Sequence, residues 1–316
     1  MIIKLSINRD KLAINHFYDC FIGVFLWLFI LVDSSAQVVT DSFGKHRFEN
    51  PPVRVVVTDW ALLEQMLELG VTPVGAPELD LYRHYVGQPK LPDGIVDIGL
   101  RRSPSIASIK SLDADVIVLG TNQKSLARPF SRISRVMYYK SFSDKYRTNG
   151  KKSRVRFLQI AELFQQTSLA KTKLAAMDAE LTVIKQQIHQ YFNHQVPPVT
   201  LIRFSGDKKA LVYGENSIAA YTLKQLNIRP AINSNRSQWG EKELTISQLK
   251  DISEGFVLYI NPVENSTVLT SSDWLLLPFV INMRVFPMAA VWSYGGAMSV
   301  LYHARAIRDA LVKINL

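Results

Sequence analysis

The chain has 316 residues, of which 47% are hydrophobic and 20% charged, with a formal net charge of +10 at pH 7. This composition is that of an ordinary globular protein, and no low-complexity tract or solenoid repeat is visible. The length suits one large domain or two of about 150 residues each. The positive charge favours an anionic partner or serves solubility alone, and no zinc-finger spacing or arginine-rich arm indicates nucleic acid.

Residues 1–36 have the pattern of a cleavable signal peptide. A basic start precedes the apolar run Phe21–Val32, which is too short for a bilayer crossing of about 20 residues. Small residues follow, so we expect cleavage after Ala36 and export to the periplasm; an uncleaved N-terminal anchor is the alternative. The sole cysteine, Cys20, precedes the run, so we expect neither a lipid anchor nor a thiolate site in the mature chain.

The region after the predicted cleavage site shows a strand–helix–strand pattern. The β-branched run 54–57 predicts a buried strand, and Asp59 is a suitable N-cap for a helix over Trp60–Leu69 that Gly70 ends. A second short strand is expected over 71–75. This βαβ order favours a parallel sheet.

The same alternation continues through residue 150. Further strands are predicted over 95–99, 115–120 and 136–139, with a short amphipathic helix over 105–112. We therefore expect an N-terminal α/β lobe over residues 37–166.

The most regular pattern lies at 167–194, where apolar residues recur every three or four positions. These are Leu174, Met177, Leu181, Ile184, Ile188 and Tyr191. A helix of about 26 residues would be about 39 Å long, which is enough to span a small lobe. We interpret it as one long, rigid connecting helix.

The α/β pattern then restarts, which predicts a C-terminal α/β lobe over residues 195–316. Strands are expected over 199–204, 210–213 and 256–260, and helices over 218–226 and 299–314. The predicted fold class is therefore α/β, with two parallel-sheet lobes joined by one long helix.

No nucleophile elbow, phosphate-binding loop or dinucleotide fingerprint is present, which lowers the expectation of an enzyme. Aromatic and arginine side chains instead occupy turns: Tyr85, Arg101, Trp239, Trp292 and Tyr294. Ligands of α/β proteins lie beyond the carboxyl ends of strands, and aromatic faces beside a guanidinium suit a flat, anionic ligand. The alternative is that these aromatic residues pack in a core.

A series of short segments runs along the chain at 41–44, 52–56, 67–75, 91–101, 212–217, 274–280 and 290–295. In this order and spacing they resemble those of the periplasmic siderophore-binding proteins of ABC importers, particularly the ferric-hydroxamate-binding branch. The resemblance implies two lobes, a shallow cleft and one long helix. It also implies a monomeric, non-enzymatic protein that passes a ferric siderophore to an inner-membrane ABC permease and its ATPase. The siderophore itself would hold the iron, with no cofactor and no protein metal site.

The same resemblance assigns site residues. Arg101 matches the arginine that contacts the iron-bound hydroxamate oxygens, while Trp239, Trp292 and Tyr294 match aromatic residues on the C-terminal side of the cleft. Tyr85 matches an aromatic residue of the N-terminal lobe, with Trp60 on the neighbouring loop.

Two positions depart from the family pattern. Gln123 stands where the family has a second hydroxamate-contacting tyrosine. Arg203 replaces a small polar residue, and an extra arginine near the cleft would favour a ligand with free carboxylates, such as a citrate-based hydroxamate. Glu241 and Glu243 are candidates for docking on the permease.

Three alternatives remain open at this stage. The same scaffold could carry a corrinoid or haem. The chain could be an exported enzyme that processes siderophores, or a non-specific anion binder that reflects only its net charge.

Overall fold

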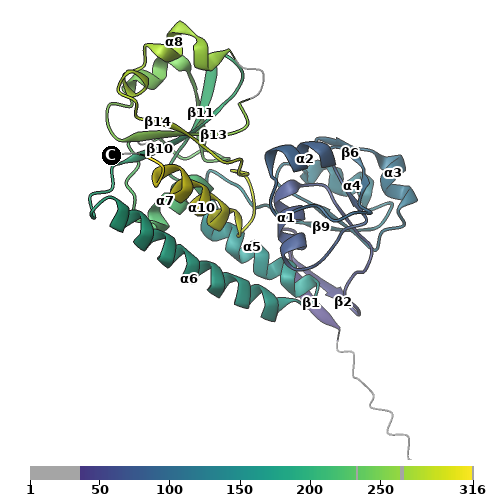
Figure 1. The fold of residues 1–316 in the computed structure, drawn as a ribbon. Helices are drawn as coiled ribbons and strands as arrows, with labels where there is room; N and C mark the ends of the chain where they lie inside the picture. The colour runs from purple at the N-terminus through teal and green to yellow at the C-terminus, as the bar shows by residue number, and fades with distance from the viewer. Residues whose placement is uncertain (1–35, 233, 264–266, 315–316) are drawn as a thin grey trace, which may run out of the picture. The chain divides into compact units, whose positions relative to one another are not determined.

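Two five-stranded sheets organise the part of the chain that this computed structural model describes, which is residues 36–232, 234–263 and 267–314 (Figure 1). The predicted signal peptide lies outside the described residues, apart from Ala36. No described helix is long and apolar enough to cross a membrane.

The N-terminal sheet has the order β5-β4-β3-β8-β9, and all its pairs are parallel. This confirms the βαβ interpretation. The strands are β3 (Val55–Val57), β4 (Gly75–Ala76), β5 (Val96–Asp97), β8 (Val116–Leu119) and β9 (Arg135–Tyr138). Its helices are α1 (Trp60–Glu68), α2 (Leu79–Tyr85), α3 (Ile106–Ser111) and α4 (Ala127–Phe130), with the 3₁₀ helix η1 (Lys124–Leu126). Two small hairpins flank it, β1 (Gln37–Thr40) with β2 (Lys45–Phe48) and β6 (Gly99–Leu100) with β7 (Ser103–Pro104).

Helix α1 begins where the sequence places it. The Asp59 carboxylate accepts hydrogen bonds from the backbone N–H groups of Ala61 and Leu62, at 2.9 and 3.2 Å. These are donors that the first helical turn leaves without partners, so the cap fixes the start of α1. Gly70 follows the helix with a φ of 73°, a conformation that suits glycine.

The C-terminal sheet is mixed, which corrects the expectation of two parallel sheets. Its order is β12-β11-β10-β13-β14, and β10, β11 and β12 pair in antiparallel fashion. The connection from β10 to β11 spans only residues 205–208, whereas a parallel crossover needs about a dozen residues or more. The strands are β10 (Val199–Phe204), β11 (Lys209–Tyr213), β12 (Glu241–Thr245), β13 (Phe256–Ile260) and β14 (Val285–Met288).

Two long helices, α5 (Asn149–Leu163) and α6 (Thr167–Tyr191), pack against each other, and α6 runs along the edge of the molecule below α10 (Figure 1). The apolar stripe of α6 is buried, as its spacing predicts. Helix α10 (Ser299–Leu311) packs on both α6 and α7 (Ile218–Gln225). The remaining elements are η2 (Ile246–Asp251), η3 (Val268–Thr270), α8 (Ser272–Leu275) and α9 (Pro278–Ile281).

One apolar core runs through both halves. It includes Val55 of β3, Phe157 of α5, Ile184 of α6, Val199 of β10 and Leu301 of α10. From Ala36 onward the chain accordingly forms one compact unit, in which the two sheets are held by shared packing.

Candidate functional site

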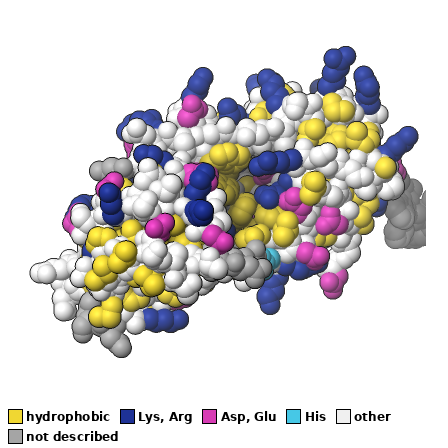
Figure 2. All heavy atoms as spheres, turned by 90° about the horizontal axis from the view of Figure 1, so that it is seen from above, with side chains coloured by type: hydrophobic (Ala, Val, Ile, Leu, Met, Phe, Trp, Pro, Cys, Tyr) yellow, Lys and Arg dark blue, Asp and Glu magenta, His cyan; other side chains and the backbone are white. Residues whose placement is uncertain are grey.

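A cavity of about 710 Å³ opens between the N-terminal and C-terminal sheets. Its N-terminal wall includes Trp60, Arg101 and Gln123, and its C-terminal wall includes Trp239, Glu241, Trp292 and Tyr294. Figure 2 shows hydrophobic side chains in a hollow, with both basic and acidic side chains near it. The volume is that of a site for a drug-sized organic molecule.

The N-terminal wall follows from sheet topology. Trp60 opens α1 directly after β3, and Gln123 lies in the loop that follows β8. Arg101 stands in the turn between β6 and β7. The carboxyl ends of parallel strands meet at one edge of a sheet, so residues far apart in the chain converge there.

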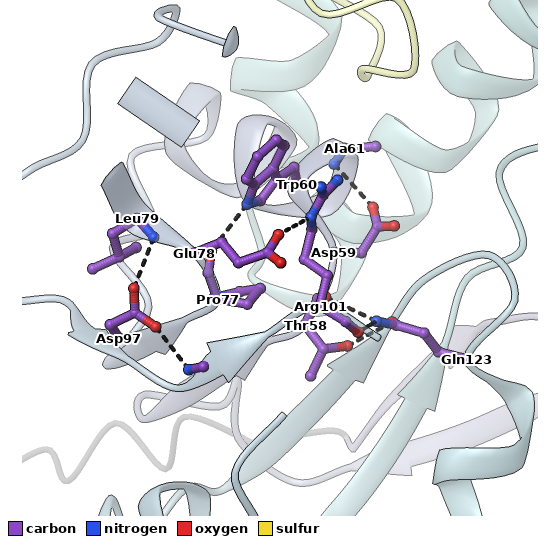
Figure 3. Close-up of polar contacts among 11 residues, drawn as sticks. Thr58, Asp59, Trp60, Ala61, Pro77, Glu78, Leu79, Asp97, Arg101 and Gln123 are labelled. Atoms are coloured by element: carbon purple, nitrogen blue, oxygen red, sulfur yellow. Dashed lines mark hydrogen bonds and ion pairs between the residues drawn. The ribbon is translucent and has the colours of Figure 1, made fainter. Parts of the chain in front are cut away.

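Arg101 is held between a carboxylate and an aromatic ring (Figure 3). Its Nε donates to Glu78, and its guanidinium carbon lies 3.5 Å from the Trp60 ring centroid and 5.5 Å from that of Trp292. The Trp60 ring is fixed in turn, because its indole N–H donates to the Pro77 carbonyl at 2.9 Å. Among the described residues no acceptor takes a hydrogen bond from the two terminal nitrogens of Arg101. A preoriented cation therefore retains donors for ligand oxygens.

Gln123 supports Arg101 and has no free amide group. Its carbonyl oxygen accepts hydrogen bonds from Thr58 Oγ1 and Gly120 N at 2.6 and 2.7 Å. Its amide group donates to the carbonyl oxygens of Thr58 and Arg101 at 2.9 and 2.8 Å. Gln123 therefore lines the cavity as a positioning residue, because its hydrogen bonds fasten the turn that carries Arg101 (Figure 3).

Three aromatic side chains form the C-terminal wall and meet edge to face. The Tyr294 ring lies 5.5 Å from Trp239 and 5.1 Å from Trp292, at interplanar angles of 75° and 81°. Trp292 also meets Trp60 of the opposite wall at 5.0 Å. These contacts keep the rings in place, so their exposed surfaces form a rigid apolar lining.

Three carboxyl groups also line the cavity: Asp59, Glu78 and Glu241. Asp59 caps α1, and loss of hydration raises its pKa. Loss of hydration likewise raises the pKa of Glu241, although a hydrogen bond from the Tyr294 hydroxyl and the charge of Arg203 oppose the shift.

Two predicted site residues do not line the cavity. Tyr85 lies half-buried on α2, where its ring packs 4.9 Å from that of His84. Arg203 is only 8% exposed, and it donates to the Val291 carbonyl at 2.6 Å. Its guanidinium carbon lies 5.8 Å from the Trp292 ring, so it supports the wall rather than facing the ligand space.

The structure separates the two glutamates expected at the docking surface. Glu243 is exposed on β12 and forms an ion pair with Lys209 at 2.7 Å. Glu241, at the start of the same strand, is half-buried and lines the cavity.

Sequence reasoning missed Glu78, which lines the cavity together with Arg102, the neighbour of Arg101 at the same strand end. Glu78 lies two residues after β4, at the sheet edge where Trp60 and Arg101 were expected, and this position could have identified it.

A dense set of polar contacts joins α1 to the start of α10 beside the cavity. The buried Glu64 carboxylate accepts from Gly296 N and Ser299 N, each at 3.1 Å, and from Ser299 Oγ at 2.7 Å. A side chain at Gly295 would place its Cβ 2.3 Å from the carboxylate, so only glycine permits this approach. Burial raises the pKa of Glu64 to about 8.

A second cavity of about 520 Å³ lies within the C-terminal half, lined by β10 and α7 residues such as Thr200 and Lys224. None of the predicted site residues lines it. Across the described residues, no group of three or more His, Cys, Asp or Glu side chains is placed to hold a metal ion.

Two α/β halves that share a core and enclose a ligand-sized, aromatic cavity define a bilobed solute-binding protein. A family model described as periplasmic binding protein matches residues 55–286, and the chain belongs to this family. The family consists of substrate-binding transport proteins rather than enzymes.

Two similar proteins are named for iron–siderophore binding. The chain is 38% identical to the siderophore-binding protein FhuD of Vibrio cholerae, whose crystal structure contains bound Fe³⁺–Desferal. That match covers 82% of this chain and 98% of the other, with a TM-score of 0.79. The chain is also 26% identical over 267 residues to the iron(3+)-hydroxamate-binding protein FhuD of Escherichia coli K12, which covers 82% of this chain and 87% of that protein.

A more distant structure has the same fold. The petrobactin-binding protein YclQ of Bacillus subtilis is 18% identical, with a TM-score of 0.70, and the match covers 89% of this chain and 99% of that one. At this identity the match supports the bilobed fold alone.

Proposed function

We propose that this protein is the periplasmic binding component of an iron-siderophore ABC importer and that its ligand is a ferric hydroxamate. The ligand would bind between Arg101 on one wall and Trp239, Trp292 and Tyr294 on the other, while Trp60, which is 1% exposed, would hold Arg101 in place from behind. The complex would then deliver it to an inner-membrane permease and its ATPase.

The observation that carries this proposal is that Arg101 is held in place and still has donors available to a ligand. Its guanidinium is fixed by Glu78 and Trp60, and no described acceptor takes hydrogen bonds from its terminal nitrogens. Charge-assisted hydrogen bonds from planar donors suit the clustered oxygens of a ferric hydroxamate. The aromatic rings suit the organic shell of such a chelate. The names of the Vibrio cholerae and Escherichia coli relatives support the same ligand class.

The organisation of the chain forms part of the proposal. Residues 1–36 would be a cleaved signal peptide, 37–166 the N-terminal lobe, 167–194 the connecting helix and 195–316 the C-terminal lobe. The mature protein would be a monomer in the periplasm. The helix α6 (Thr167–Tyr191) and the core shared by both halves support a connection that permits only small lobe movements.

Titration of tryptophan fluorescence with ferric hydroxamates tests the ligand class. Trp60, Trp239 and Trp292 line the cavity, so a bound ferric chelate should quench them saturably, with a dissociation constant on the order of 1 µM or tighter. Haemin and cyanocobalamin are the comparison ligands. Saturable binding of either, with no quenching by any ferric hydroxamate, would favour the corrinoid or haem alternative.

A further inference from the structure

The charge of the cavity differs from that of the whole protein. Two arginines, Arg101 and Arg102, line it, whereas its carboxyl groups number three: Asp59, Glu78 and Glu241. The carboxyl groups therefore outnumber the cations in the cavity of a chain whose formal net charge is +10. A ligand inside the cavity meets these local charges at short range, while distant surface charges are screened by solvent and salt.

Two of the three carboxyl groups already have partners within the wall. Glu78 forms an ion pair with Arg101, and Asp59 accepts two backbone hydrogen bonds at the start of α1. These interactions stabilise the N-terminal wall. The third carboxyl group, Glu241, belongs to the C-terminal wall.

Glu241 retains an oxygen that has no described donor. The Tyr294 hydroxyl donates to its Oε2, and among the described residues no hydrogen bond reaches Oε1. Its charged neighbours are Arg203, which favours the carboxylate, and Glu243, which disfavours it. The pKa of Glu241 remains raised by the loss of hydration, which an added cation would offset.

The surroundings of Glu241 suit an ammonium group. Trp239 and Tyr294 line the same cavity, and Tyr294 contacts the carboxylate directly. A primary ammonium can donate to a carboxylate while it lies against aromatic faces, and the partial loss of water strengthens both interactions. A carboxylate-bearing ligand would instead face like charge.

We propose that Glu241 is a specificity-determining residue that makes the cavity prefer ferric hydroxamates with a free primary amine over those with a free carboxylate. This inference rests on the proposed function and deepens it. It reverses the preference for carboxylate-bearing ligands that the presence of Arg203 suggests from the sequence, because Arg203 lies behind the wall.

Three ferric chelates that differ at one end test the inference: ferric desferrioxamine B with its free amine, its N-acetyl derivative and its N-succinyl derivative. We expect affinity to fall in that order, by about tenfold from the amine to the neutral acetyl form and further for the succinyl form. The measurement is the dissociation constant from fluorescence quenching at low and at physiological salt.

Variants assign the preference to a residue. Glu241→Gln keeps the shape and the hydrogen bond from Tyr294, so it should lose most of the preference for the amine, measured as the ratio of the dissociation constants of the N-acetyl and amine forms. Glu243→Gln, two positions along β12 and exposed, should keep the wild-type order.

Different outcomes would overturn the proposed function and the role of Glu241. Failure of all three chelates to bind wild type would overturn the proposed function. Equal binding of the three, or preference for the succinyl form, would leave the function standing and overturn the role of Glu241. An equal loss for all three chelates in Glu241→Gln would also overturn it, because the residue would then only shape the wall.

Discussion

Glu64 and Glu241 lie in neighbouring regions of the protein and differ in how fully their carboxyl groups are used. Glu64, where α1 meets α10, is buried and accepts three hydrogen bonds. Glu241, on the wall of the cavity, is half-buried and accepts one from Tyr294. Burial raises the pKa of both. A shifted pKa alone therefore does not distinguish a structural acid from a ligand-facing one, whereas the set of donors does.

The contrast extends to the cations. Arg203 is buried behind Trp292 and donates to a backbone carbonyl, while Arg101 keeps its terminal nitrogens free of described acceptors. We interpret the α1–α10 contact as the structural joint of the molecule and the adjoining cavity as its ligand site.

Removal of the Glu64 carboxyl group tests the joint and should give the largest effect. Glu64→Ala leaves three buried donors unpaired, so we expect the free energy of unfolding to fall by about 4 kcal/mol. Urea denaturation measures it. Glu254→Ala, an exposed partner of Arg229, is the control and should change little. Equal effects of the two substitutions would refute the structural role of Glu64.

Removal of the Arg101 guanidinium tests the site. Arg101→Ala should weaken ferric hydroxamate binding about 100-fold, because charge-assisted hydrogen bonds to ligand oxygens are lost. The affinity of Arg101→Lys should lie between those of wild type and Arg101→Ala, since lysine keeps the charge without the planar donors. Fluorescence titration gives the affinities. The control is Arg83→Ala, on α2, where Arg83 pairs with the exposed Asp80; it should bind as wild type does. If Arg101→Ala bound the chelate as tightly as Arg83→Ala, Arg101 would not contact the ligand.

The pH dependence of stability sharpens the comparison further. The folded pKa of Glu64, about 8, is above the ordinary value of 4.5. Its stabilising contribution to the free energy of unfolding is therefore complete below pH 4.5 and is lost as the pH rises through 8. Burial lowers the pKa of His303 to about 4, so its contribution is complete above pH 6.5 and is lost as the pH falls through 4.

The window from pH 6.5 to 8 therefore separates the contribution of Glu64 from that of His303. In this window the free energy of unfolding of wild type should fall with pH more steeply than that of Glu64→Gln. The difference between the two slopes should be up to about 1.4 kcal/mol per pH unit. Urea denaturation at pH 6.5, 7.2 and 8 measures both slopes. Parallel slopes for the two proteins would show that Glu64 does not titrate in this range.

Gln123 should give the smallest effect. Gln123→Ala removes the hydrogen bond to the Arg101 carbonyl and should loosen the turn without removing the guanidinium. We expect about a fivefold loss of affinity, equivalent to about 1 kcal/mol. A further loss when Gln123→Ala is added to Arg101→Ala would mean that Gln123 contacts the ligand itself rather than acting through Arg101.

Much of the cavity could be predicted from the sequence because sheet topology determines it. Trp60, Arg101 and Gln123 each follow a strand or stand in a turn next to one, and the ends of parallel strands converge. Trp239 stands in a polar segment, which favours a ligand-facing position, and it lines the cavity while its ring also packs 5.2 Å from the buried Phe142. The stripe of α6 similarly predicted its buried face.

The position of Arg203 behind the cavity wall could not be predicted from the sequence. Residues 199–203 of β10 are all buried, so the strand has no polar–apolar alternation that would tell which face Arg203 occupies. The net charge is equally uninformative about the site, because it sums surface groups that a ligand inside the cavity hardly senses. The mixed C-terminal sheet follows from the short 205–208 connection, a signal that was present but outweighed by the preceding βαβ pattern.

Locating the iron directly tests the central claim. Crystals soaked with ferric desferrioxamine B, measured at the iron absorption edge, should show one anomalous peak inside the cavity that Arg101, Trp239 and Tyr294 line. A peak instead in the cavity lined by Thr200 and Lys224, or on the outer surface, would contradict the account.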